Sequence, residues 1–439
     1  MLLFILFITW NEGKAQSGWT SVASGTNSDL YGVYMYPLFE LPLSYSGPTG
    51  FAVGGNGTIL ETTDKGEYWY TVTSGTHPDL HAIIFREPDS GYVVGANGTI
   101  LRSTNRGASW VQQASGVTVD LNSIVSSLPV SHGTNAWVCG DSGTILITIN
   151  NGASWIGPVG ETGTTRSLHS INMFAQIGIG TLYTCGDSGT VINSTRAGYY
   201  WNTLTAHSNF DFYSVATLED TVWIAGTHGI VIVSTDEGNT WLIESTHVSV
   251  TLRSIFVAAP GLSPIPMFPP GDAYAVGDSG TILHSTNNGR TWVRQPSGTT
   301  NTLYEVIFTD SLTGTIVGAN GTILHTNTGG VVSVRIPNGK SQLPKHYALF
   351  QNYPNPFNPS STISYSLPQK SFVTLKLYDI LGREMRTLVN AEQEPGNYSR
   401  IVDANDLPSG VYFYRLQVGN PSASSGHGFT DTKKMVLLK

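Results

Sequence analysis

Three serines lie in a setting where serine can act as a nucleophile. The stretch Gly-Asp-Ser-Gly-Thr occurs at residues 140–144, 186–190 and 277–281, which places Ser142, Ser188 and Ser279 between an aspartate and a glycine. A serine nucleophile needs one base to take its proton and one set of donors for the oxyanion. Whether any of the three belongs to such a site depends on what occupies the equivalent places elsewhere in the chain.

The three stretches belong to a larger set of Gly-x-x-Gly elements. These begin at Gly54, Gly95, Gly140, Gly186, Gly226, Gly277 and Gly318. Asn or His replaces the serine in the other copies, at Asn56, Asn97, His228 and Asn320. Ser, Asn and His alternating at one place are typical of a two-residue hairpin turn that ends in glycine. One copy alone resembles the nucleophile segment of chymotrypsin-like serine proteases, but the set favours an architectural role.

The composition favours many short strands joined by tight turns. Only 12% of the 439 residues are charged, 49 are glycine, and no long segment has the 3.6-residue period of an amphipathic helix. The net charge of −8 is spread along the chain without a basic patch. Nucleic acid and anionic lipid surfaces are therefore not expected as partners.

The N-terminus predicts export. Residues 1–10 are an apolar run too short to span a bilayer, and Gly13-Lys14-Ala15 fits cleavage before Gln16. We interpret residues 1–15 as a secretory signal peptide and expect no transmembrane segment. Export would permit a disulfide between Cys139 and Cys185, but their equivalent positions in adjacent repeats favour two separate buried thiols.

Tryptophans at a fixed distance define the repeat. Fifteen residues after each of the first six Gly-x-x-Gly elements come Trp69, Trp110, Trp155, Trp201, Trp241 and Trp292. The turn before each reads like Ser234 to Trp241, and its Asp or Asn is expected to bond backbone amides of its own turn. Those residues are Asp64, Asn105, Asn150, Asp236 and Asn287, with Arg196 in the remaining copy. Each unit is predicted to hold four strands.

These turns resemble the Asp box of bacterial neuraminidase repeats. With the Gly-x-x-Gly-Thr-Ile-Leu element they are similar to the photosystem II stability/assembly-factor-like family over residues 18–331. The resemblance implies an all-β, seven-bladed propeller, placed at residues 16–336 with a linker at 337–350. The seventh unit lacks its Trp, so Trp19 is expected to supply the outer strand of the last blade, with Val331 to Ile336 as the competing segment.

The C-terminal region, residues 351–439, has period-2 patterning that predicts a small β-sandwich. It resembles the type A C-terminal sorting domain of the type IX secretion system, on Tyr353 to Pro359, Leu377 to Arg383, Leu407 to Tyr412 and Lys433 to Lys439. The motif residues singled out are Gly382, Gly410, Tyr412, Lys433 and Lys434. The resemblance implies recognition by the type IX secretion machinery and delivery to the cell surface or beyond.

One residue per unit is placed to line the mouth of the propeller channel. Each follows the Leu or Phe that opens a first strand, and the set is Tyr31, His81, Asn122, His169, Tyr213, Arg253 and Tyr304. Such a ring could bind a peptide or sugar by stacking and hydrogen bonds, or could simply fill the channel. In four units an aspartate stands directly before the opening Leu or Phe: Asp29, Asp79, Asp120 and Asp211. These aspartates are expected to cap turns, with a cation-binding rim as the alternative. Loops at 37–50, 127–135 and 258–272 form a second candidate surface.

Catalytic chemistry has little support in the residues. A sialidase site needs three arginines and a tyrosine nucleophile, and Arg335-Ile-Pro337 lies at the wrong end of the chain for the sialidase pattern. No histidines have metal-ligand spacing, so no metal or cofactor is expected. We predict an exported, non-catalytic propeller that binds or scaffolds a surface protein or glycan. A surface glycoside hydrolase and an assembly-factor-like chaperone of a membrane complex are the alternatives.

Overall fold

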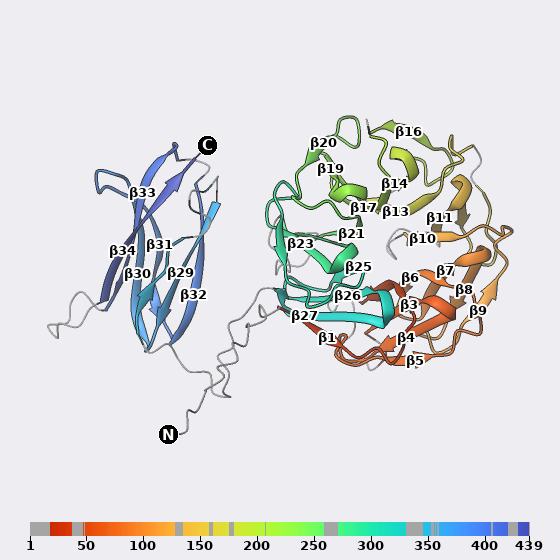
Figure 1. The fold of residues 1–439 in the computed structure, drawn as a ribbon, viewed down its shortest axis with the longest axis horizontal. Coiled ribbons are helices and arrows are strands. Elements are labelled where there is room, and N and C mark those ends of the chain that lie inside the picture. Colours follow the sequence, from red (N-terminus) through yellow and green to blue (C-terminus); the bar gives the residue numbers. More distant parts are fainter. Residues whose placement is uncertain are drawn as a thin grey trace, which may run out of the picture. The chain divides into compact units, whose positions relative to one another are not determined.

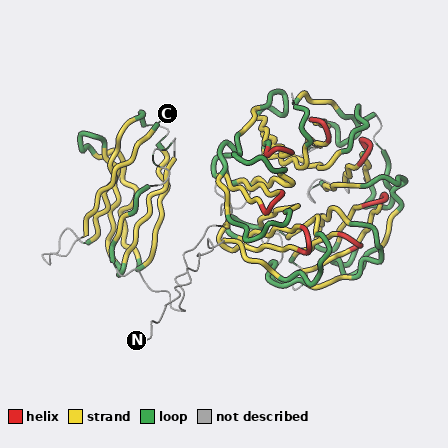
Figure 2. The backbone as a smooth tube through the Cα atoms, in the orientation of Figure 1, coloured by secondary structure: helices red, strands yellow, loops and turns green. Residues whose placement is uncertain are grey.

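The computed structural model describes residues 18–36, 47, 49–127, 135–157, 161–174, 180–206, 208–258, 271–330, 346–352, 355, 357, 360–404, 407–419 and 429–438. In these ranges the chain forms strands, loops and short 3₁₀ turns (Figure 2). No helix in the described part of the chain is long and apolar enough to cross a membrane. The signal peptide at 1–15 lies outside the described residues. Two compact units are present, within residues 1–334 and 335–439.

The first unit contains seven antiparallel sheets, numbered here in chain order. Their first strands are β2 (Leu30–Met35), β6 (Leu80–Glu87), β10 (Leu121–Ser126), β13 (Leu168–Phe174), β17 (Phe212–Leu218), β21 (Leu252–Val257) and β25 (Leu303–Phe308). Their second strands are β3 (Gly50–Gly54), β7 (Ser90–Gly95), β11 (Ala136–Gly140), β14 (Thr181–Gly186), β18 (Thr221–Gly226), β22 (Ala273–Gly277) and β26 (Thr313–Gly318).

The third and fourth strands complete these sheets toward the outside. The third strands are β4 (Thr58–Thr62), β8 (Thr99–Ser103), β12 (Ile145–Thr148), β15 (Thr190–Ser194), β19 (Val231–Ser234), β23 (Thr281–Ser285) and β27 (Thr322–Gly330). The fourth strands are β5 (Tyr70–Val72), β9 (Val111–Gln113), β16 (Asn202–Thr205), β20 (Leu242–Glu244), β24 (Val293–Gln295) and, in the seventh sheet, β1 (Gly18–Val22). In the third sheet, a single bridge between Ile147 and Ile156 stands at this place.

The sheets follow one another around a circle. The first strands of successive sheets contact each other, and β2 contacts both β6 and β25 (Figure 1). Most of the buried clusters join residues of neighbouring sheets; one of them includes Phe51 and Ile59 from the first sheet with Leu80 and Val93 from the second. The core is therefore a series of layers between neighbouring sheets, and every sheet buries both faces.

The two ends of the ring meet in the seventh sheet. Strand β1 pairs with β27, with Gly18 opposite Gly330. Trp19 is 3% exposed, and its indole N–H donates to Gln295 Oε1 at 2.8 Å. Gln295 Nε2 in turn donates to the carbonyl of Gly329 at 3.0 Å. The competing segment, Val331 to Ile336, lies outside the described residues.

The Gly-x-x-Gly elements are tight turns between second and third strands. They form η1 (Gly55–Gly57), η2 (Ala96–Gly98), η3 (Asp141–Gly143), η4 (Asp187–Gly189), η5 (Thr227–Gly229), η6 (Asp278–Gly280) and η7 (Ala319–Gly321). In η1 both Asn56 and Gly57 have positive φ, at 57° and 67°, and Thr58 N–H donates to Gly55 O. This is the type I′ geometry favoured in hairpins. A Cβ on Gly57 would lie 2.1 Å from Thr76 O, so this position requires glycine.

The Asp boxes are hydrogen-bonded turns that hold the fourth strands. In the fifth sheet, Ser234 Oγ accepts from Gly238 N–H at 2.8 Å and Asp236 Oδ1 accepts from Thr240 N–H at 2.8 Å. Equivalent bonds from an Asp or Asn occur at Asp64, Asn105, Asn150 and Asn287. Arg196 provides no such acceptor, and its guanidinium lies over the Tyr200 ring at 5.8 Å instead. The serine bond to glycine is kept there, from Gly198 N–H to Ser194 Oγ.

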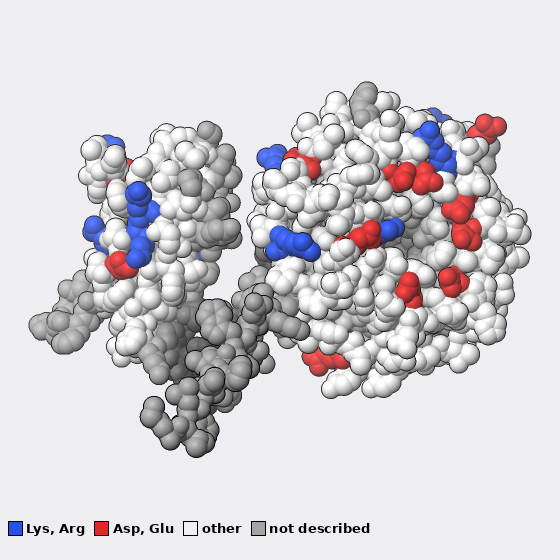
Figure 3. All heavy atoms as spheres, viewed as in Figure 1, with Lys and Arg blue, Asp and Glu red and all other residues white. Residues whose placement is uncertain are grey.

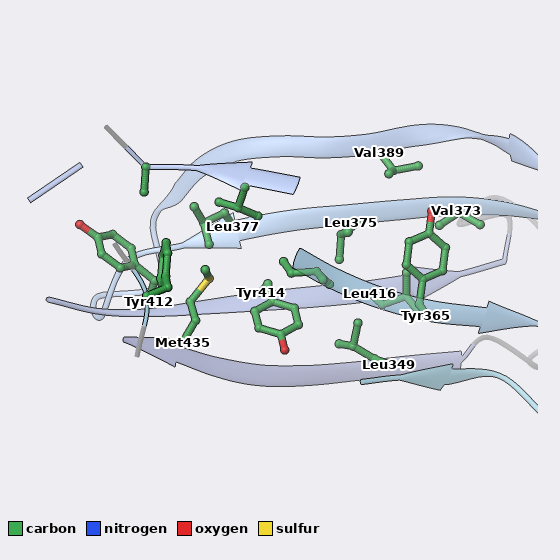
Figure 4. Packing of buried hydrophobic residues seen from close by; sticks show 14 of the residues in the cluster. Leu349, Tyr365, Val373, Leu375, Leu377, Val389, Tyr412, Tyr414, Leu416 and Met435 are labelled. Carbon is green, nitrogen blue, oxygen red and sulfur yellow. The ribbon is translucent and has the colours of Figure 1, made fainter. Parts of the chain in front are cut away.

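The second unit consists of two antiparallel sheets. One is formed by β28 (Ala348–Leu349), β29 (Ser360–Leu367) and β32 (Gly396–Asp403), and the other by β31 (Glu384–Gln393), β30 (Ser371–Tyr378), β33 (Gly410–Val418) and β34 (Phe429–Leu437). Side chains from both sheets form one buried cluster, with Tyr365 from the first and Leu375, Tyr414 and Met435 from the second (Figure 4). The alternating pattern of the sequence directs these residues to the shared interior.

Candidate functional site: the mouth of the central hollow

A β-bulge stands at the same place in all seven first strands. The pairing register shifts immediately after the opening Leu or Phe, as between Leu30 and Gly32. The residue inside each shift is one of the seven mouth residues, Tyr31, His81, Asn122, His169, Tyr213, Arg253 and Tyr304. A bulge leaves its extra residue outside the ladder and redirects the side chain. All seven are half-buried.

Three of these side chains form an aromatic group across the seventh, first and second sheets. The Tyr31 ring lies 5.1 Å from the Tyr304 ring and 5.7 Å from the His81 ring, measured between centroids. His81 Nδ1 lies 3.0 Å from the Leu121 carbonyl oxygen of the next sheet. Burial, followed by the charges of Asp79 and Asp29, raises the pKa of Tyr31 to about 12. The phenol therefore stays neutral and can donate a hydrogen bond at physiological pH.

A second group spans the fourth, fifth and sixth sheets. The rings of His169 and Tyr213 are stacked with centroids 4.9 Å apart, and the Arg253 guanidinium lies 4.7 Å from the centre of the Tyr213 ring. Tyr213 is thus held between an imidazole and a cation, an arrangement in which stacking and cation–π attraction both act. Asn122 stands in the third sheet, and its Nδ2 donates to Leu168 O at 3.0 Å.

Aspartates of the tight turns orient the polar mouth residues. Asn122 donates to Asp141 at 3.1 Å, His169 Nε2 lies 2.7 Å from Asp187 Oδ1, and Arg253 Nε lies 3.0 Å from Asp278 Oδ1. These aspartates were not assigned a role from the sequence, although each belongs to a Gly-Asp-Ser-Gly-Thr stretch. The signal was present: Asp occurs in the turn only where the mouth residue of that sheet is Asn, His or Arg.

The four aspartates that precede the mouth residues cap turns, and the turns belong to neighbouring sheets. Asp79 accepts from Asn56 N–H at 2.8 Å, and Asp120 accepts from Asn97 N–H at 2.9 Å. Asp211 and Asp29 bond Ser188 and Asn320 in the same way. The sequence predicted capping but not that it would link one sheet to the next. On the face shown in Figure 3, acidic side chains surround the hollow at the centre of the ring.

A hoop of hydrogen bonds lies one residue further along the first strands. The hydroxyls of Ser123, Ser170, Ser214 and Ser254 each accept a backbone N–H from the next sheet. Glu305 has this position in the seventh sheet, where its carboxylate accepts from Val33 N–H of the first. Burial raises the pKa of Glu305 to about 7. The sequence did not predict this hoop of hydrogen bonds, because a serine in a strand carries no signal for a bond to another repeat.

The arrangement supports binding chemistry. The seven side chains comprise three phenol rings, two imidazoles, an amide and a guanidinium, which offer stacking faces and hydrogen-bond donors. Ser142, Ser188 and Ser279 are central turn residues with φ of 58°, 52° and 57°. Among the described residues, no hydrogen bond joins these hydroxyls to a histidine, and no cluster of three or more His, Cys, Asp or Glu could hold a metal. The candidate loops at 37–50, 127–135 and 258–272 lie mostly outside the described residues.

The two cysteines are buried free thiols. Cys139 Sγ lies 3.7 Å from Leu168 O, and burial raises its pKa to about 12. Burial also raises the pKa of Cys185. Both therefore remain protonated and act as small apolar core residues.

The predicted sorting-motif residues lie in the turn between β30 and β31, in the interior strand β33 and in the edge strand β34 of the second unit. Gly382 has φ of 79° in the turn between β30 and β31, where Asp379 Oδ1 accepts from Leu381 N–H at 2.9 Å. Gly410 opens β33, and Tyr412 is buried with its hydroxyl donating to Pro408 O at 2.7 Å. Lys433 and Lys434 lie in β34, where Lys433 Nζ is 3.4 Å from Asp431 Oδ2 and Lys434 O accepts from Gln351 Nε2 at 2.7 Å.

Comparison with known proteins gives separate results for the two units. Residues 40–103, 67–159 and 244–327 match the family model "Photosynthesis system II assembly factor YCF48", and residues 351–425 match "Secretion system C-terminal sorting domain". None of the curated proteins matches the chain.

Solved structures resemble the fold at low sequence identity. One titled "YCF48 bound to D1 peptide" is 17% identical, has a TM-score of 0.55 and covers 71% of this chain and 97% of its own. YCF48 from Cyanidioschyzon merolae is 19% identical, with the same TM-score, and covers 71% of this chain and 99% of its own. The chain is therefore a propeller resembling the photosystem II assembly-factor family, built of bacterial neuraminidase-type Asp-box repeats and followed by a secretion-system C-terminal sorting domain.

Proposed function

We propose that the protein is an exported, seven-bladed propeller that binds a protein or glycan ligand at the mouth of its central hollow. On this proposal the seven sheets are the seven blades, and the second unit is a small sandwich that the type IX secretion machinery recognises. The protein then acts at the cell surface or beyond it. It binds or scaffolds and does not catalyse.

The observation that carries the proposal is the gathering of the seven mouth residues. A bulge aims each of them, and turn aspartates fix Asn122, His169 and Arg253. Side chains that only fill space do not need to be aligned by charged partners, whereas a recognition surface gains affinity when its groups are held in place before the ligand arrives. The exposed parts of Tyr31, Tyr213 and Tyr304 supply stacking faces for a sugar ring or a peptide side chain.

A glycan and peptide array tests this site. The full-length protein is compared with the triple variant Y31A/Y213A/Y304A, and we expect the variant to lose the binding that the wild type shows. The matched control is Y68A/Y70A/Y200A, which removes three tyrosines that are 50–64% exposed outside the mouth. Binding that survives the mouth variant, or falls equally in the control, contradicts a ligand at the mouth.

An assembly role is the second candidate, favoured by the match of the first unit to an assembly-factor family. The photosynthetic task of that family does not transfer, because the sorting domain implies a different destination. Binding to peptides but not to glycans on the same array would support a chaperone-like role.

A glycoside hydrolase is a weaker candidate, favoured only by Glu305, whose raised pKa would suit a general acid. Hydrolysis of an arrayed glycan by the wild type that is abolished in E305Q would establish it.

The export proposal is tested by removing residues 351–439. We expect the shortened protein to stay inside the outer membrane, whereas the full chain reaches the surface or the medium. Fractionation followed by immunoblotting measures this. Equal export of the two forms contradicts recognition through the second unit and leaves the mouth proposal untouched.

A further inference from the structure

The second strands carry a polar anchor at one repeated position. Three residues before the Gly-x-x-Gly glycine, four side chains each donate to a backbone carbonyl of the next sheet at 2.8 to 3.3 Å: Trp137, Tyr183, Trp223 and Tyr274. The acceptor lies in the Asp-box turn for the first three and is Gly329 O, at the end of β27, for Tyr274. The bond ties each sheet to its neighbour. It also satisfies a polar group at a buried position.

Tyr92 has the same position in the second sheet and breaks the pattern. It is 2% exposed, and within the described part of the chain its hydroxyl has no hydrogen-bond partner. A buried hydroxyl without a partner is destabilising, and such groups are uncommon in native proteins. Its sister residues show that an acceptor at this position is the rule.

Two arginines surround this hydroxyl. Arg86 belongs to β6, and Arg102, on β8, lies opposite Tyr92. Burial raises the pKa of Tyr92, and the positive charges of Arg102 and Arg86 together with a side-chain interaction between Tyr92 and Arg102 lower it, so both guanidinium groups are close to the phenol. The Nε atoms of both arginines are buried without a well-formed hydrogen bond among the described residues. The Tyr92 oxygen is therefore a nearby acceptor for these two guanidinium groups, and no carboxylate of the described chain neutralises them at this place.

The two arginines border a pocket of about 240 Å³ between the second and third sheets. It is lined by Arg86, Asp89, Ser90, Arg102, Thr104 and Asn151. Arg86 Nη1 donates to Asn151 Oδ1 at 3.3 Å, which fixes one guanidinium. Asp89, the only carboxylate among the lining residues, is engaged at 2.6 Å by Arg106 Nε and leaves the two lining arginines uncompensated.

The equivalent junction between the fourth and fifth sheets is acidic, whereas the junction of the second and third sheets carries two arginines. There Tyr183 donates to Glu237 O, and the smaller pocket beside it is lined by Glu219, Asp220 and Glu237. The paired arginines are therefore particular to the second and third sheets and do not follow from the repeat.

We propose that the Arg86–Arg102 pocket binds a small oxyanion group, a carboxylate or a sulfate, which accepts hydrogen bonds from the two guanidinium groups that line it. Two oxygens on one group match the fork geometry of guanidinium donors, and charge-assisted bonds of this kind are about twice as strong as neutral ones. The hydroxyls of Ser90 and Thr104 stand at the rim for the remainder of the ligand. This site is separate from the mouth and does not depend on it.

Acetate and sulfate are the probes, titrated into the full chain at constant ionic strength, with acetamide as the neutral analogue. The side-chain Nε–H resonances of Arg86 and Arg102, assigned from R86Q and R102Q, are followed by NMR. We expect both to shift saturably with acetate or sulfate and not with acetamide. Stronger binding of acetate assigns the pocket to planar carboxylates, and stronger binding of sulfate to tetrahedral oxyanions.

The variants separate this site from general charge effects. We expect R102Q to weaken binding at least about tenfold, because one of the two charged donors is lost. R294Q removes an exposed arginine of the sixth sheet and is expected to bind as the wild type does. A second variant, R86Q, and the melting temperature of each protein exclude a folding defect as the cause. Shifts that do not saturate, or saturable binding retained in both R86Q and R102Q, overturn the proposal.

Discussion

Single residues link neighbouring sheets throughout the ring. Asp79 bonds the turn of one sheet from the next, Ser170 Oγ accepts from the sheet that follows it, and Glu305 does the same where the last sheet meets the first. These three bonds join residues 23, 45 and 272 positions apart in the chain. Changing one of these residues should therefore alter the junction between sheets and leave the sheets themselves intact.

The pH dependence of stability should contain a contribution from Glu305. Its pKa rises from an ordinary 4.5 to about 7 in the folded chain, because burial disfavours the charged form. The folded state then binds the proton more tightly than the unfolded state, so this contribution is complete below about pH 4.5 and is lost as the pH rises through about 7. Since Glu305 is only half-buried in the described chain, we expect about 1–3 kcal/mol.

The measurement compares wild type with E305Q, which keeps an acceptor for Val33 N–H but cannot titrate. Relative to E305Q, the wild type should lose free energy of unfolding as the pH rises from 4 to 8. A difference that stays constant over this range contradicts a titrating Glu305.

Removing the hydroxyl of Tyr92 and removing that of Tyr183 should change the free energy of unfolding in opposite directions. Y92F takes away a buried donor that has no partner in the described chain, so we expect no loss of stability or a gain of up to about 1 kcal/mol. Y183F breaks the bond to Glu237 O and should cost about 1 kcal/mol. Urea unfolding at neutral pH measures both. Equal destabilisation by the two changes would show that Tyr92 does have an acceptor.

At the scale of elements, repetition made the fold predictable. The fixed spacing from Gly54 to Trp69 and its copies predicted the turns and the strands between them, but not the bulge at each mouth residue. Repetition could not predict Asp141 as a partner of Asn122, because that bond depends on how a bulge turns one side chain toward a turn of the same sheet. It also could not predict the order β31, β30, β33, β34, because non-repeating strands can pair in several orders with the same alternating pattern.

Strand β1 closes the ring, and we expect it to be the element most sensitive to mutation. Trp19 lies 5.7 Å from the ring of Phe308 and bonds Gln295, and Trp-to-Ala changes at buried sites cost about 3–5 kcal/mol. Strand β1 has no covalent neighbour within its sheet. In W19A we therefore expect selective cleavage near the N-terminus under limited proteolysis, with the remaining sheets still protected.

The matched control is W110A. Trp110 is also buried, but its sheet is made of strands consecutive in the chain. This variant should lose stability without becoming sensitive at the N-terminus. Mass spectrometry of the fragments identifies the first cut, and the same first cut in both variants would contradict the special position of β1.

At the scale of the whole molecule, the described chain has two kinds of core. The buried cluster of the second unit draws only on residues 349–437, and the clusters of the first unit draw on residues 19–324. No buried cluster of described residues mixes the two. We therefore expect the ring to keep its structure when the sorting domain is removed, because its buried clusters are its own.

Calorimetry should reveal this independence. We expect two unfolding transitions in the full chain, and a protein ending at residue 345 should lose one of them while the other keeps its midpoint within about 2 °C, since its buried contacts are unchanged. A single cooperative transition, or a marked fall in the remaining midpoint, would show that the units stabilise each other.

The pairing of β1 with β27 has a consequence for synthesis. Residue 18 is made almost at the start of translation, yet its partners near residue 325 are the last part of the ring to be made. Until then the earliest strand and the last sheet each present an unpaired edge, which is open to aggregation. The ring can therefore close only once the chain has been made through Gly330, and a product that ends earlier leaves both edges unpaired.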